Sequence, residues 1–382
     1  MKKSKITVKR VWKKETIAKN DEENSVSIPL DLIREILARL PAKPLVKLIS
    51  ISKLWYSTIR KKDFTDLFLA RSLIRPCFLF TFSYAAANRF FFNSFFYKSP
   101  SSLHRNTTSY TTLDQDYTIS TPVRGLMSCQ NGSKVVIFNP STGQVLALPK
   151  VKTRRKSVLS FLGYDPVEDV YKVLCMTMIQ AVLYQHRPFV WGEHQVFTLG
   201  AETKEWRRVD CHIPHFPATL GLCKDGVVYY GAWSDSDRNE SLVVCFDVGS
   251  EQFRCVKLPN DVEIRTNHRS EVVNYHKTIA LVEQSYGGVV DLWVLDDVEK
   301  KEWSKKYLVV PCWNDLVGQN YYFHCRGTIC TGEFVFTPHS QPNPSFIVYY
   351  DLKKDSATRV ETEDGFPITN VFLDHVENPM FL

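Results

Sequence analysis

The sequence has no apolar run long enough to span a bilayer, because its longest runs, such as Val173–Met178 and Cys77–Phe82, cover about six residues. No apolar core follows the basic N-terminus, which argues against a secretory signal. No Cys-x-x-Cys pair occurs among the ten cysteines. We therefore expect free thiols in a reducing compartment, and an intracellular protein of the cytoplasm, the nucleus or both that does not contact a membrane.

The sequence also lacks the common motifs of catalytic and nucleotide-binding sites. It contains no G-x-x-x-x-G-K-[ST], no G-x-S-x-G and no H-E-x-x-H. Two clusters superficially resemble metal ligands, Cys211-His212 with His215 and His324-Cys325 with Cys330, but neither has a paired-cysteine spacing. We therefore expect no catalytic residues, no metal and no cofactor.

A charge excess is confined to one end of the chain. The 48 basic and 41 acidic residues give a net charge of +7, and residues 1–19 alone carry eight basic residues and one acidic residue. The remaining chain is therefore neutral, so the charge does not indicate a nucleic-acid-binding domain. We expect residues 1–23 to form a basic, disordered arm; nuclear import or contact with a polyanion is the alternative.

After this arm, the sequence predicts a small helical module. Apolar residues recur with helical spacing between Pro29 and Leu40, and Pro41 is expected to end that helix. Pro44 opens a second predicted helix over 45–51, and Ser52 is a predicted N-cap for a third. Three short helices bury too little apolar area to be stable alone. This favours an interaction module that docks on a partner over an enzyme.

These residues resemble an F-box. The match runs over residues 24–70 and rests on Ile28-Pro29, Glu35-Ile36-Leu37, Arg39-Leu40-Pro41, Leu45-Val46 and Ser52-Lys53-Leu54-Trp55. The resemblance implies binding to a Skp-type adaptor and, through it, to the cullin of an SCF ubiquitin ligase. It further implies that a set of nine residues forms or supports the adaptor-binding surface: Pro29, Ile33, Ile36, Leu37, Leu40, Pro41, Leu45, Val46 and Trp55. The alternative is an ordinary helical cap on the following domain.

Downstream, a strand pattern recurs about every 50 residues. Each of five segments is a β-rich run that ends in a turn residue, usually with a bulky residue six positions later. The turn residues and their partners are Asn139 with Val145, Gly200 with Trp206, Asp247 with Phe253, Asp297 with Trp303, and Asp351 with Ala357. Further hairpins lie between these segments, which makes four strands per unit. The pattern predicts a β-propeller of roughly six units over residues 76–380, with a β-sandwich or another irregular all-β fold as the alternative.

This region resembles the plant F-box-associated domain of type 3, which is β-propeller-like. The resemblance rests on Val136–Gly143, Ser160–Pro166, Tyr171–Leu174, Gln195–Gly200, Gly226–Tyr230 and Trp293–Leu295. It implies recruitment of a target protein, with unknown target-binding residues. The expected whole is a short three-helix F-box followed by a large all-β domain, acting as a non-catalytic substrate-recognition subunit of an SCF ubiquitin ligase. A propeller enzyme that uses a metal or carboxylates, and a non-degradative protein-binding scaffold, are the alternatives.

Overall fold

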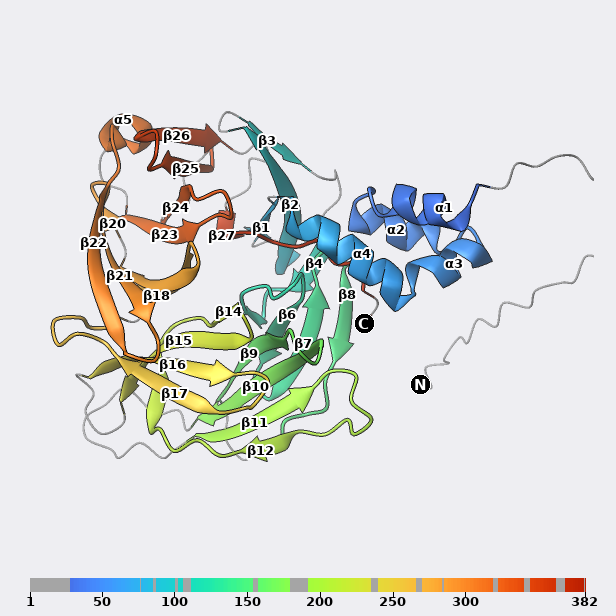
Figure 1. Ribbon diagram of the computed structural model, residues 1–382, viewed down its shortest axis with the longest axis horizontal. Helices are drawn as coiled ribbons and strands as arrows, with labels where there is room; N and C mark the ends of the chain where they lie inside the picture. The colour runs from blue at the N-terminus through green and yellow to red at the C-terminus, as the bar shows by residue number, and fades with distance from the viewer. Residues whose placement is uncertain are drawn as a thin grey trace, which may run out of the picture.

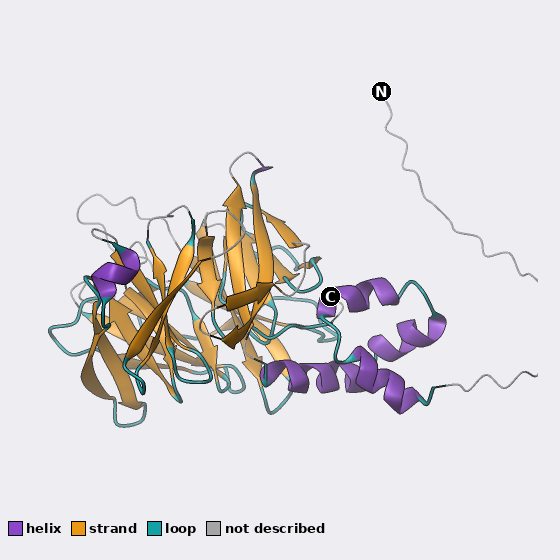
Figure 2. Ribbon diagram, turned by 90° about the horizontal axis from the view of Figure 1, so that it is seen from above, coloured by secondary structure: helices purple, strands orange, loops and turns teal. Residues whose placement is uncertain are grey.

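The computed structural model describes residues 28–75, 77–84, 87–99, 102–105, 111–153, 157–178, 192–234, 240–265, 270–283, 285–318, 322–339, 344–361, 368–380 and 382. The predicted basic arm, residues 1–23, lies outside these ranges. A helical module stands out from the side of a large β domain (Figures 1 and 2). No helix of the described ranges has the length and apolar character needed to cross a membrane.

The helical module consists of α1 Leu30–Leu37, α2 Ala42–Leu48, α3 Lys53–Ile59 and α4 Lys62–Leu73. Ser52 caps α3 as predicted, because its Oγ accepts a hydrogen bond from the Leu54 amide at 3.2 Å. A small apolar core joins the four helices and consists of Leu37, Ala38, Ala42, Leu45, Ile59, Phe64 and Phe68.

Three details of the helix prediction were wrong. The first helix ends at Leu37 and does not continue up to Pro41. The amides of Arg39 and Leu40 bond to carbonyls three residues earlier, which makes a tighter turn. The second helix begins at Ala42, since Pro44 lies in its first turn, where a missing N–H costs no hydrogen bond. The fourth helix was not predicted; it adds Phe64 and Phe68 to the core and leads into the β domain.

The described strands form five sheets. The first contains β1 Cys77–Tyr84, β2 Arg89–Ser99, β3 Ser102–Arg105, β4 Thr111–Asp114 and the C-terminal β27 Ile368–Phe372. The second contains β5 Thr118–Ile119, β6 Met127–Asn131, β7 Lys134–Asn139 and β8 Gln144–Ala147. The third contains β9 Ser157–Asp165, β10 Val170–Met178, β11 Glu193–Thr198 and β12 Arg207–Val209. The fourth contains β13 His215–Pro217, β14 Leu222–Lys224, β15 Val227–Ser234, β16 Ser241–Asp247 and β17 Phe253–Lys257.

The fifth sheet has nine strands and combines two meanders. The first meander is β18 Ser270–Tyr275, β19 Thr278–Glu283, β21 Val289–Asp297 and β22 Glu302–Val309. The second is β23 Tyr322–Thr328, β24 Phe334–Pro338, β25 Phe346–Asp351 and β26 Ser356–Glu361, preceded by the short helix α5 Trp313–Val317. Strand β20, Ser285–Tyr286, joins the two. The described strands thus form five sheets around a common centre, the propeller-like arrangement that the repeats predicted (Figure 1).

The repeated pattern corresponds to the last two strands of successive units. The residue six positions after the turn residue sits on the returning strand in four of the five segments, in the pairs Phe138↔Val145, Phe246↔Phe253, Leu295↔Trp303 and Tyr350↔Ala357. In the remaining segment Trp206 lies one residue before β12. The turn side chains bond locally, as Asp351 Oδ1 does by accepting from the Lys353 amide at 3.0 Å, and Gly200 supplies a φ of +79°.

The two ends of the β domain meet in the first sheet. β27 pairs with β1, with Leu79 opposite Phe372, and this pairing closes the ring. The aromatic run of β2 supplies core residues: Phe92 and Phe95 are buried, and Phe90 and Phe91 are half-buried. The side chains of Phe96 and Tyr97 lie outside the described residues.

Beyond β27, the C-terminal segment, residues 374–380, runs between the ring and the helical module. The His375 amide donates to the Cys77 carbonyl at 2.9 Å, and the Asn378 side-chain amide donates to the Arg124 carbonyl at 2.8 Å. Asn139 in turn donates to the carbonyls of Asn378 (3.0 Å) and Met380 (3.1 Å). Asn139 and Asn378 are both fully buried, so the segment is anchored along the β7–β8 edge.

His375 makes the fold sensitive to acid. Both of its ring nitrogens are buried without a hydrogen-bond partner among the described residues, and burial lowers its pKa to about 3. The unfolded chain binds a proton below pH 6.5 and the folded chain does not, so stability falls as the pH drops from 6.5 towards 3. We expect a loss of about 2 kcal/mol between pH 7.5 and pH 5 from this residue.

Urea unfolding of wild type and His375→Asn at pH 7.5 and pH 5 measures this loss. The variant should show a pH dependence that is smaller by that amount, whatever its stability at pH 7.5. Equal pH dependence in both proteins would show that His375 is protonated in the folded state.

Candidate adaptor-binding face and central pocket

The structure divides the nine predicted adaptor-binding residues into three groups. Leu37 and Leu45 are buried in the core of the helical module and can support a surface but not form one. Pro29 and Ile36 are exposed. The other five are half-buried: Ile33, Leu40, Pro41, Val46 and Trp55.

An exposed apolar stripe runs along the same module. Leu32 and Ile36 are four residues apart in α1 and share one helix face, with exposed fractions of 54% and 51%. Ile28 precedes them, and two more apolar residues are exposed nearby, Ile51 in the turn before α3 and Leu54 in the first turn of α3. Four of these five residues were not in the predicted set. Helical periodicity assigns apolar residues to a face but does not separate the buried face from an exposed one, so the sequence could not distinguish Leu32 from Leu37.

Hydrogen bonds fix the module to the β domain. The Glu377 carboxylate accepts from the Ala42 amide at the start of α2 (3.2 Å), and the Glu377 amide donates to Ser72 Oγ in α4 (2.8 Å). Lys62 of α4 pairs with Asp169 in the β9–β10 turn, and this contact, with a hydrogen bond from Tyr164, lowers the Asp169 pKa. The C-terminal segment and α4 therefore set the direction in which the helical module points.

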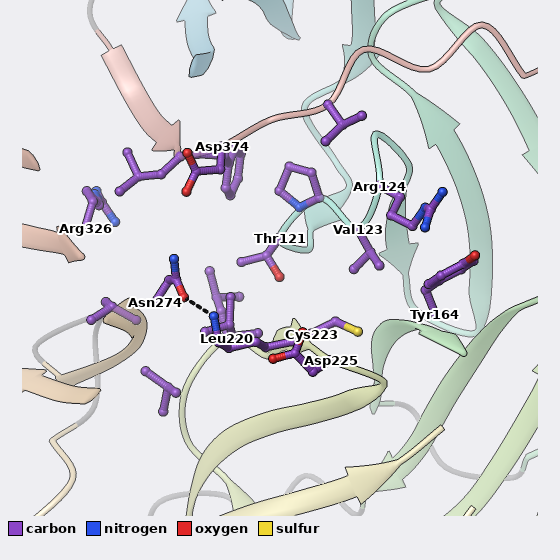
Figure 3. Close-up of a pocket in the computed structure, with 18 of the residues that line it drawn as sticks. Thr121, Val123, Arg124, Tyr164, Leu220, Cys223, Asp225, Asn274, Arg326 and Asp374 are labelled. Carbon is purple, nitrogen blue, oxygen red and sulfur yellow. Dashed lines mark hydrogen bonds between the residues drawn. The ribbon is translucent and has the colours of Figure 1, made fainter. Parts of the chain in front are cut away.

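A pocket of about 580 Å³ lies at the centre of the ring (Figure 3). It is lined by the β5–β6 connection, by β9, β14, β18 and β23, and by the segment that follows β27. Leu73, at the end of α4, also lines it. Residues from most sheets of the ring and from the helical module therefore line the pocket.

Charged groups of both signs line the pocket, and most are held by neighbours. Lys224 donates to Asn274 Oδ1 at 2.8 Å, and Arg326 donates to both carboxylate oxygens of Glu271 at 3.0 and 3.1 Å. Asp374 accepts from the Cys330 amide at 3.0 Å, and burial raises the Asp374 pKa.

Arg124 is held differently from the other charged groups of the pocket. Its guanidinium stacks on Tyr164, 4.3 Å from the ring centre, and has no hydrogen bond or ion pair to a described residue. A cavity with apolar walls, fixed polar groups and an arginine that makes no ion pair with a described residue suits the binding of a polar segment of another molecule.

The two clusters that superficially resembled metal ligands in the sequence differ in the structure. His324 hydrogen-bonds to His339 (2.9 Å) and lies 3.5 Å from the Glu271 carboxylate, whereas Cys330 is exposed. Cys211 and His215, by contrast, come together with a third residue, His194, which the sequence reading missed. All ten cysteines are free, as expected.

A projecting helical module joined to a propeller-like ring fits the F-box class, and comparison with known families shows that class. Residues 26–67 match the F-box domain, and residues 77–377 match the F-box associated beta propeller domain. The chain belongs to this family of F-box proteins.

Relatives from Arabidopsis thaliana match over nearly the whole chain. The F-box/kelch-repeat protein At3g04660 is 39% identical, with 98% of each chain covered, and the F-box protein DOR is 34% identical, with 94% of each covered. Among solved structures, dipeptidyl peptidase 4 of Porphyromonas gingivalis shares 10% identity over 74% of this chain and 44% of its own, with a TM-score of 0.34. That likeness is too weak to support a peptidase activity.

Proposed function

We propose that this protein is a substrate-recognition subunit of an SCF ubiquitin ligase, with no catalysis of its own. Its helical module binds a Skp-type adaptor and, through it, a cullin, and its β domain recruits a target protein inside the cell. The bound target is held at a high local concentration near the activated ubiquitin that other subunits supply.

The observation that carries this proposal is the exposed apolar stripe on an F-box module. Leu32 and Ile36 lie on a helix that the β domain does not cover, and their exposure costs free energy unless a partner buries them. An adaptor that covers Ile28, Leu32, Ile36 and Leu54 would remove this apolar surface from water. The buried Leu37 and Leu45 then hold the helices in the geometry that the adaptor meets.

The target is recruited by the central pocket and the loops around it. This assignment is supported by the convergence of four strands, the β5–β6 connection and the C-terminal segment on one cavity. It is also supported by the guanidinium of Arg124, which makes no ion pair with a described residue. Loops on a rigid ring can vary in sequence without loss of the fold, which suits recognition of a particular target.

The double variant Leu32→Asp/Ile36→Asp tests adaptor binding. Two carboxylates in an apolar interface should weaken binding at least 100-fold, because each would be buried without a partner. Both positions are exposed, so the variant should keep the wild-type melting temperature. The measurement is the affinity of the purified protein for a recombinant Skp-type adaptor.

Val167→Asp is the matched control, because Val167 is an exposed apolar residue of the β9–β10 turn, with an exposed fraction of 85%. It should bind the adaptor like wild type. If a folded wild-type protein does not bind the adaptor, or if the double variant binds equally well, the proposed role of the helical module is wrong.

A further inference from the structure

One cysteine and two histidines meet between two neighbouring sheets. Cys211 Sγ and one ring nitrogen each of His194 and His215 lie within 4.8 Å of one another. His194 lies on β11 of the third sheet, and His215 begins β13 of the fourth, four residues after Cys211. The two imidazole rings are 5.5 Å apart, and Phe253 covers His194 at 5.0 Å.

The cluster has an unused polar group. All three side chains are partly buried, yet the ring of His194 has no hydrogen bond to a described residue; only ring contacts with His215 and Phe253 surround it. Imidazoles in such positions normally have a hydrogen-bond partner or a ligand. A ring nitrogen of His194 is therefore available to a ligand.

His215 is oriented by its surroundings. Its Nδ1 lies 2.8 Å from the Ile213 carbonyl, and its Nε2 lies 2.7 Å from the Tyr230 hydroxyl. A metal would replace one of these two contacts, and the other would then orient the ring, as hydrogen bonds from metal-ligating histidines usually do. If the Tyr230 hydroxyl is displaced, Met176 Sδ remains as its acceptor at 3.8 Å.

The donor atoms indicate which metal fits. A thiolate and two neutral imidazoles form a set typical of zinc, with metal–ligand distances of about 2.3 Å for sulfur and about 2.0 Å for nitrogen. On binding, the Cys211 thiol loses its proton to solvent.

We propose that His194, Cys211 and His215 bind one zinc ion, with water in the fourth position of a tetrahedral site. No strand of the third sheet pairs with a described strand of the fourth, so the ion would link two sheets that otherwise meet only through side chains. This site departs from the sequence expectation of no metal. It stands independently of the ligase proposal, because it lies in the β domain and not in the helical module.

Metal analysis of the untagged, full-length protein tests the site. The protein is expressed in zinc-supplemented medium and purified without chelator. We expect one equivalent of zinc in wild type, and less than a tenth of that in Cys211→Ser and in His215→Asn. His212→Ala is the matched control: His212 is adjacent to Cys211 but exposed and outside the cluster, so this variant should retain one equivalent.

Cobalt substitution provides a second readout that does not depend on any variant folding. Wild type loaded with Co²⁺ should show a thiolate-to-cobalt charge-transfer band, and a chelator should remove the band and lower the melting temperature by several degrees. Wild type without zinc and without the cobalt band would overturn the proposal. Zinc retained by folded Cys211→Ser and His215→Asn would overturn it as well.

Discussion

Replacing Phe80 by alanine is expected to lower the free energy of unfolding by about 3–5 kcal/mol. Phe80 lies on β1 and is fully buried, with the ring of Phe95 4.8 Å away and those of Phe78 and Phe82 at 6.3 and 6.1 Å. The substitution removes the ring and leaves a cavity that these neighbours cannot fill. Because β1 pairs with β27, the weakened strand is also the one that closes the ring.

Urea unfolding followed by tryptophan fluorescence measures this effect. Phe90→Ala is the control, since Phe90 lies in the neighbouring strand but is only half-buried, and its loss should cost less than about 2 kcal/mol. Equal costs for the two substitutions would show that closure between β1 and β27 does not depend on the Phe80 cluster.

Replacing Asn378 by alanine is expected to cost about 2–4 kcal/mol, because two partly buried hydrogen-bonding groups lose their partner. The Asn378 side chain donates to the Arg124 carbonyl at 2.8 Å and accepts from the Met380 amide at 2.8 Å. Asn378 directly follows Glu377, which holds the start of α2. A loosened C-terminal segment should therefore also loosen the helical module from the β domain.

Hydrogen exchange shows this second effect. In Asn378→Ala, exchange should become faster in residues 375–380 and in α2, while the outer strands of the ring keep wild-type rates. Ser141→Ala is the control, because it removes a single bond, from the Asn378 amide to Ser141 Oγ at 3.2 Å. Faster exchange throughout the ring would mean that Asn378 supports the whole propeller rather than the attachment of the helical module.

The repeats were predictable from the sequence because their signal is local. A turn residue such as Asp297 and its partner Trp303 are six positions apart, and the two-residue period of the strands fixes which side chains face each other. The resemblance to known domains supplied the F-box, but the helix ends were wrong by several residues, because tight turns and first-turn prolines leave little trace in apolar spacing.

The parts that could not be predicted depend on contacts between distant residues. Glu377 meets Ala42 across 335 positions, and no pattern near either residue indicates that pairing. His194 and Cys211 are brought together by the packing of two sheets, and their spacing matches no metal-ligand motif. The exposure of Leu32 and Ile36 depends on where α4 and the C-terminal segment place the helical module.

The central claim is that one chain links a target to a ubiquitin ligase, and ubiquitination of the proteins bound to it tests this most directly. Wild type, Leu32→Asp/Ile36→Asp and Arg124→Glu are expressed in Arabidopsis thaliana with proteasome inhibition, and co-purified proteins are scored for ubiquitin-modified lysines. We expect the same set of proteins to bind wild type and the double variant, but to be ubiquitinated only with wild type. Arg124→Glu should lose these proteins and still bind the adaptor. Ubiquitination of the same proteins to the same extent with the double variant would contradict the account.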